Sequence, residues 1–157
     1  YVDEYIHKNE HSIEFQALFL KYLYPSRDIT MIPVLCSSMY DSVKNGISPY
    51  EDNEVQEFVD LLKTIVQDYR ERICLIAGVD FSHIGKRFGS EINISPEVRF
   101  SLEKTDQAYL ESILHGDAET FIRLVSKEQN KTNVCGVPAL YTLLKVLEPK
   151  TSKYLLW

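Results

Sequence analysis

The sequence predicts an α/β fold, with a largely parallel sheet covered by helices on both faces. Two short apolar runs rich in β-branched residues, Ile29–Cys36 and Ile73–Val79, are typical of strands buried on both faces. Amphipathic stretches, with apolar residues at three- and four-residue steps, alternate with these runs. Because alternating strands and helices favour a parallel sheet, we expect residues 1–157 to form a single α/β domain.

The first half of the chain is expected to hold a helix, a strand, a loop and a second helix. The first helix covers residues 10–23, and Pro25 with Ser26 closes it. After the strand at 29–36, residues 40–49 read as a surface loop because Asp, Ser, Asn, Gly and Pro recur there. A long amphipathic helix follows over about residues 53–70.

Three helices are expected in the second half, after the strand at 73–79 and a loop at 85–96. Ser95 is a suitable N-cap for a helix that Pro96 opens and Gly116 ends. Asp117 caps a shorter helix, and a polar link leads from it to a last helix over residues 139–147.

The two ends of the chain predict an incomplete domain. The sequence begins at Tyr1, already within a polar segment, and stops at the strand-like run Tyr154–Trp157. Since a strand is rarely the last element of a domain, we expect the single domain 1–157 to lack an N-terminal and a C-terminal segment.

Composition excludes several classes of protein. The net charge is −6 and no basic stripe is present, so a nucleic-acid partner is not expected. No apolar stretch approaches the roughly 20 residues that cross a bilayer, so no membrane association is expected. Three well-separated cysteines favour reduced thiols and a cytoplasmic location, with Cys36 and Cys74 as buried core thiols.

A carboxylate and an imidazole appear where the strand at 73–79 should end, in Asp80-Phe81-Ser82-His83. In open α/β sheets, ligand sites lie outside the carboxyl ends of the strands. Asp80 and His83 are therefore candidate catalytic residues. The alternative is that Asp80 only caps a turn and that His83 has no part in chemistry.

Two further segments carry metal-binding side chains. In Glu10-His11-Ser12-Ile13-Glu14, His11 and Glu14 lie one turn apart on the predicted helix, where a carboxylate can orient a metal-binding imidazole. The alternative is an acidic helix start that suits the helix dipole. Cys135 precedes a helix, where the dipole favours the thiolate. No glycine pattern for a nucleotide is present, so no nucleotide cofactor is expected.

Four segments in this order resemble the Memo family, including its prokaryotic AmmeMemoRadiSam-type members, which occur alongside a radical-SAM protein. The segments are Glu10-His11-Ser12-Ile13-Glu14, Ile32-Pro33-Val34-Leu35, Asp80-Phe81-Ser82-His83 and Cys135-Gly136 with Pro138. That family is similar in fold to the class III extradiol (LigB-like) dioxygenases, which use a non-haem iron. The resemblance thus implies a dioxygenase-like α/β fold and a radical-SAM companion protein as a partner.

The resemblance also implies a role for individual residues. His11 and Cys135 would bind the metal, Asp80 and His83 would lie beside it, and His83 would act as the acid–base group. Imidazole with thiolate suits copper, iron or zinc, and we expect iron or copper as the cofactor. The family's upstream Pro-His-x-Gly segment has no counterpart in residues 1–157: either the chain begins downstream of it, or one ligand has been lost.

Two functions follow as hypotheses. The first is a Memo-like protein with an iron or copper pocket that is redox-active or oxygen-activating. The second is a non-catalytic module that binds a (phospho)peptide or another small anionic ligand in the same pocket. Glu14, Lys86 and Arg87 would contact that ligand, the last two as cations beside His83.

Overall fold

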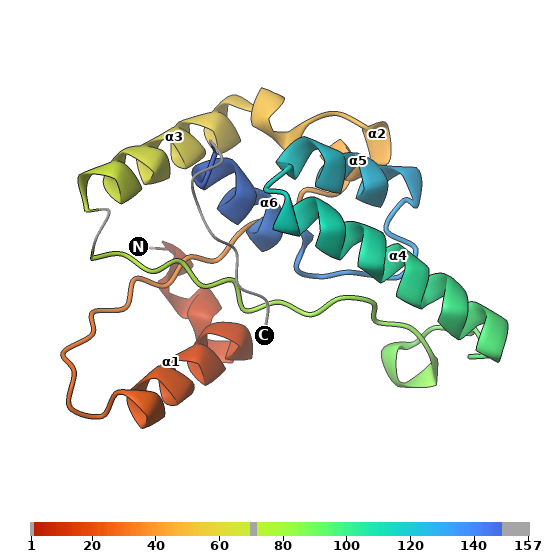
Figure 1. The fold of residues 1–157 in the computed structure, drawn as a ribbon, viewed down its shortest axis with the longest axis horizontal. Helices are drawn as coiled ribbons and strands as arrows, with labels where there is room; N and C mark the ends of the chain where they lie inside the picture. Colours follow the sequence, from red (N-terminus) through yellow and green to blue (C-terminus); the bar gives the residue numbers. More distant parts are fainter. Residues whose placement is uncertain (1, 70–71, 149–157) are drawn as a thin grey trace. The chain divides into compact units, whose positions relative to one another are not determined.

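The computed structural model describes residues 2–69 and 72–148, and the chain divides into two compact units, residues 1–37 and 38–157. The described ranges contain helices and no β-strand (Figure 1). The predicted dioxygenase-like α/β class, with a parallel sheet covered by helices, is therefore wrong. The strand expected at Tyr154–Trp157 lies outside the described residues.

Both runs expected as central strands are loops (Figure 1). Within the described residues, no backbone hydrogen bond to another segment involves residues 29–35 or Ile73–Val79, and a strand exists only through such a ladder. Their apolar side chains are also partly open to solvent, with Ile32 81% and Ile76 49% exposed. A β-branched run favours extended backbone, but it does not specify the partner that turns extended backbone into sheet.

The first unit is built around one α-helix. A 3₁₀ helix, η1 (Val2–Asn9), precedes α1 (His11–Leu23), which confirms the helix predicted at 10–23. Glu10 is the N-cap: its Oε1 accepts a hydrogen bond from the Ser12 backbone N at 2.8 Å. Hydrogen bonding to Ser12 lowers the pKa of the Glu10 carboxyl below its ordinary value.

The second unit holds the remaining helices. They are α2 (Tyr40–Asn45), η2 (Pro49–Glu51), α3 (Asn53–Asp68), η3 (Lys86–Phe88), α4 (Pro96–Leu114), α5 (Ala118–Lys127) and α6 (Val137–Val146). The long helices α3 and α4, the shorter α5 and the last helix α6 were all predicted. The loop expected at 40–49 is wrong, because it contains α2 and the start of η2.

Side-chain caps begin the longer helices of the second unit. Ser95 Oγ accepts from the Val98 backbone N at 3.3 Å, and Asp117 Oδ1 accepts from the Thr120 backbone N at 2.8 Å, as the sequence predicted. Asp52 does the same for α3, through the Glu54 backbone N at 2.9 Å. These local signals place helix starts correctly because they act within one turn.

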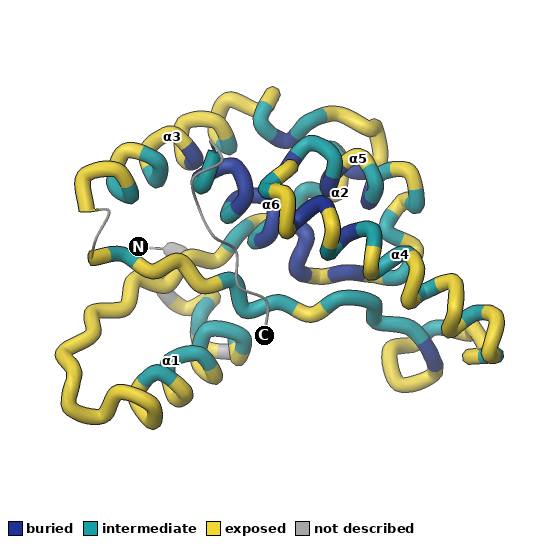
Figure 2. The backbone as a smooth tube through the Cα atoms, in the orientation of Figure 1, coloured by how far each residue is buried: buried dark blue, intermediate teal, exposed yellow. Residues whose placement is uncertain are grey.

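The core of the second unit lies on α5 and α6. Helix α5 packs against α2, α4 and α6, while α6 also packs against α3. Figure 2 shows the buried backbone gathered on these helices and on the adjoining end of α4. The Tyr109 and Phe121 rings meet edge to face, with centroids 5.9 Å apart. Burial raises the pKa of the Tyr109 hydroxyl to about 12.

A polar network fastens the start of η2 to α5 and α6. The fully buried Tyr141 hydroxyl donates to Glu119 Oε1 at 2.9 Å, lies 2.9 Å from Ser48 Oγ, and accepts from the Tyr50 backbone N at 3.3 Å. Lys145 Nζ lies 3.3 Å from the same Glu119 oxygen. Burial raises the pKa of Tyr141, so its hydroxyl remains a donor in this network.

Candidate functional site

Residues 79–88 and 130–136, far apart in the sequence, lie against each other in the second unit. The His83 backbone N donates to the Thr132 carbonyl oxygen at 2.7 Å. Gly136 packs so closely on Val79 that a Cβ at position 136 would lie 2.5 Å from the Val79 Cβ. The Asp-Phe-Ser-His and Cys-Gly segments therefore share one region of the molecule, although no sheet edge brings them together.

Both ring nitrogens of His83 face an oxygen acceptor. Nδ1 lies 2.7 Å from the Phe81 carbonyl oxygen, and Nε2 lies 3.5 Å from Asp80 Oδ2. Since a carbonyl oxygen only accepts, Nδ1 carries a proton. A second proton on Nε2 would then point toward the Asp80 carboxylate. Nε2 is thus the ring nitrogen that faces a side chain rather than the backbone.

Asp80 and His83 differ in their access to solvent. The Asp80 side chain is 82% exposed, whereas that of His83 is 19% exposed. The Phe88 ring contacts the His83 ring edge to face, with centroids 4.9 Å apart, and shields it on that side. A contact with so exposed a carboxylate contributes little to stability.

The two cations predicted as ligand contacts lie on η3, directly after His83-Ile84-Gly85. Gly85 has φ of +98°, which only glycine adopts without strain, and the turn at Gly85 leads into η3. Lys86 and Arg87 are exposed, and within the described residues neither forms an ion pair. The Arg87 guanidinium lies 6.0 Å from the centroid of the Phe88 ring. Within the described residues, two unpaired positive charges thus lie three and four residues after His83 in the chain.

Asp106 on α4 is a supporting residue that the sequence did not reveal. Ser82 Oγ donates to Asp106 Oδ1 at 2.8 Å and so ties the 80–83 segment to α4. Nothing local marks Asp106, because the contact depends on how α4 packs against a segment 24 residues earlier. A Ser-to-carboxylate contact of this kind fixes the backbone on which His83 is carried.

Cys135 lies where the sequence placed it, immediately before α6. It is exposed, and Gly136 is the residue that caps the helix. The prediction of buried core thiols is wrong for Cys74, which is exposed, while Cys36 is half-buried. Residues 73–79 form a loop instead of the predicted buried strand, and Cys74 is therefore exposed.

His11 and Glu14 belong to the first unit. The His11 ring meets Phe15 edge to face, with centroids 5.9 Å apart, and Glu14 lies in the first turn of α1. Their association with Cys135 joins residues of the two units and stays a prediction. Among the described residues, no three His, Cys, Asp or Glu side chains converge as a metal site would require.

Within residues 2–69 and 72–148, no helix has both the length and the apolar character needed to span a bilayer.

Comparison with known proteins identifies a family and several relatives by sequence. A family model described as Memo-like protein matches residues 1–156. A MEMO1 family protein of Aquifex aeolicus is 30% identical over 146 residues, which cover 93% of this chain and 34% of the relative. A MEMO1 family protein of Thermus thermophilus is 26% identical over 148 residues, which cover 94% of this chain and 39% of the relative.

The relatives are considerably longer than this chain. A MEMO1 family protein of Methanococcoides burtonii is 27% identical over 143 residues, or 91% of this chain and 44% of the relative. The chain therefore spans between about a third and under half of the curated relatives it matches. No solved structure matches.

Proposed function

The chain belongs to the family of Memo-like proteins, and from this premise we propose that residues 80–88 bind a small anionic ligand and exchange a proton with it through His83. The observation that carries the proposal is the fixed imidazole: Nδ1 is held by the Phe81 carbonyl oxygen and Nε2 faces Asp80. An imidazole held by one nitrogen exchanges its proton at the other.

Charge around the imidazole supports an anion as the ligand. Lys86 and Arg87 have no carboxylate partner among the described residues, although the chain as a whole is acidic. A phosphate or carboxylate that approached η3 would gain charge-assisted hydrogen bonds without first breaking an ion pair. Asp80 faces Nε2 of the same imidazole at 3.5 Å and would orient the ring toward the bound anion.

Phenyl phosphate is a suitable probe for this proposal. In the full chain, we expect it to shift the His83 ring resonance in the proton NMR spectrum in a saturable manner, with His83→Gln assigning the signal among four histidines. The double variant Lys86→Ala/Arg87→Ala should weaken binding about tenfold or more, equivalent to at least about 1.4 kcal/mol.

The matched control is Lys104→Ala/Lys127→Ala, which removes the same charge from exposed positions on α4 and α5. The affinity of this control for phenyl phosphate should stay within about twofold of that of the unaltered chain, since charges that do not contact the ligand are screened by salt. Equal losses in the two double variants, or no saturable shift of His83, would contradict the proposal.

A second candidate is an iron or copper site that includes His11 and Cys135. It is favoured by the Cys135 thiol, a soft metal ligand that is exposed and lies two residues before Val137, the first residue of α6. The described donors do not by themselves form a complete site, so no reaction step is assigned to the metal. Bound iron or copper would supply redox chemistry.

Metal analysis of the purified full chain tests the second candidate. The bound iron or copper per chain should fall below about half in both His11→Ala and Cys135→Ser, because a site with few protein ligands does not tolerate the loss of one. Cys74→Ser, a change at another exposed thiol, is the control and should keep the metal. Unchanged metal in both single variants would rule the candidate out.

A further inference from the structure

A cavity of about 420 Å³ lies in the second unit, between α2 and the loop that leads into α6. Its walls come from residues 38–44 and 129–138. Small-molecule sites usually enclose a few hundred Å³, so the cavity has the size of a metabolite site. No residue of 80–88 lines it, so the inference stands apart from the anion site proposed there, while Cys135 in its wall is also a ligand of the second candidate.

One wall of the cavity is a loop held in an unusual backbone conformation. Gln129, Asn130 and Asn133 have φ of 51°, 47° and 52°, values that side-chain-bearing residues rarely adopt. The Asn130 side chain secures the loop, since its Oδ1 accepts from the Val134 backbone N at 2.9 Å and its Nδ2 donates to the Val134 carbonyl oxygen at 3.2 Å. The wall is thus formed before any ligand binds, as in many binding sites.

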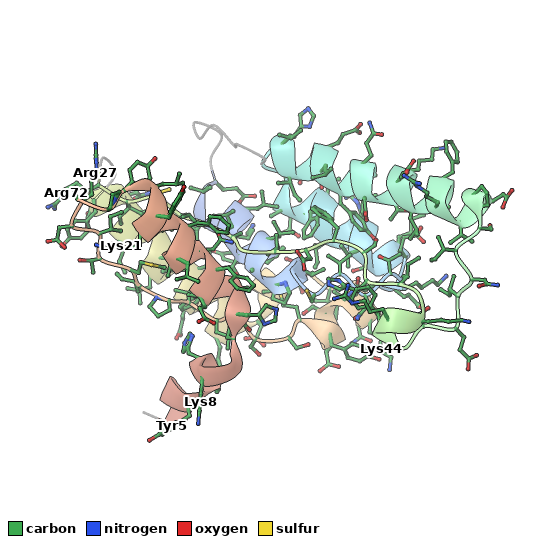
Figure 3. The ribbon with its side chains drawn as sticks, turned by 90° about the horizontal axis from the view of Figure 1, so that it is seen from below. Tyr5, Lys8, Lys21, Arg27, Lys44 and Arg72 are labelled. Carbon is green, nitrogen blue, oxygen red and sulfur yellow. The ribbon has the colours of Figure 1, made fainter. Side chains whose placement is uncertain are left out.

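The lining of the cavity combines apolar surface with a single positive charge. Val43, Val134 and Val137 are buried and supply apolar surface. Lys44 is the lining's only charged side chain, and in the described part of the chain it has no ion-pair partner. Its ammonium group lies 5.7 Å from the Tyr40 ring centroid, and Figure 3 labels it. The lining contains no carboxylate, although the net charge of the whole chain is −6.

We propose that the cavity binds a small organic anion, with an apolar body of about one ring against Val43 and Pro138 and a carboxylate or phosphate group against Lys44. The amides of Gln129 and Asn133 make no side-chain hydrogen bond within the described residues and line the same space. They are available to the polar groups of the ligand. The Cys135 thiol in the wall provides a chemical readout of occupancy.

The probe is the aryl carboxylate disulfide DTNB, which carries one ring and one carboxylate on each half. The Cys135 thiolate attacks the disulfide sulfur, a mixed disulfide forms, and the nitrothiobenzoate thiolate leaves. If the cavity binds the reagent first, the labelling rate of Cys135 in the full chain saturates with DTNB concentration. Peptide mass spectrometry reads Cys135 separately from the exposed Cys74, whose rate should rise linearly.

Lys44→Met should raise the half-saturating DTNB concentration at least about tenfold, while Lys131→Met should change it by less than about twofold. Lys131 is exposed, lies in the same loop region and is not part of the lining, so it controls for charge at a distance. The uncharged disulfide dithiodipyridine should label Cys135 equally in all three proteins. A linear DTNB dependence at Cys135, or saturation that survives Lys44→Met, would overturn the proposal.

Discussion

Phe121→Ala is expected to lower the free energy of unfolding of the second unit by about 3–5 kcal/mol. Phe121 on α5 is fully buried and packs edge to face on Tyr109 of α4. Truncation to Ala removes the transfer free energy of the ring and leaves a cavity where α4 and α5 meet, because neighbouring helices relax only partly. Since single domains are stable by only about 5–15 kcal/mol, much of the total would be lost.

Urea titration followed by circular dichroism measures this effect, and Phe100→Ala is its matched control. Phe100 lies on α4 but is 69% exposed, so its truncation should change the free energy of unfolding by no more than about 0.5 kcal/mol. The same residue type is thus removed from a buried and from an exposed position. A loss at position 100 as large as that at position 121 would mean that α4 and α5 do not pack as described.

The helices of this protein could be predicted because their signals are local. Ser95 and Asp117 cap α4 and α5 within one turn, and the apolar spacing over residues 53–70 needs no knowledge of the partner helix. The short helix α2 was missed because residues 40–49 are rich in residues that are common in loops. Asp, Ser and Asn among them also favour the ends of helices.

The two strands were wrong for a different reason. The β-branched runs at 29–36 and 73–79 predict extended backbone, whereas a sheet also needs a neighbouring strand at the correct distance and register. Asp80 and His83, three residues apart in the chain, lie 3.5 Å from each other, and their catalytic role stays a prediction. Asp106 could not be predicted, because its contact with Ser82 exists only once α4 is in place.

Gly136→Ala is expected to destabilise the protein by about 1–3 kcal/mol, despite a backbone that suits alanine. Gly136 has φ of −74°, a value that alanine adopts without strain. However, the added Cβ would lie 2.5 Å from Val79 Cβ and 2.8 Å from Val79 Cγ1. The segments must therefore separate, and the hydrogen bond from His83 N to Thr132 O should weaken with them.

Hydrogen exchange distinguishes this effect from ordinary loss of stability. Gly46→Ala is the control: its φ of +66° makes alanine cost about 1–2 kcal/mol, but no atom lies within 4 Å of the new Cβ. Both variants should lower the free energy of unfolding. Only Gly136→Ala should also make hydrogen exchange at the His83 amide faster than this loss of global stability explains. Adding Val79→Gly removes both clashing atoms, so the double variant should recover part of the His83 protection. A neutral Gly136→Ala with normal His83 protection would mean that the two motifs are not in contact.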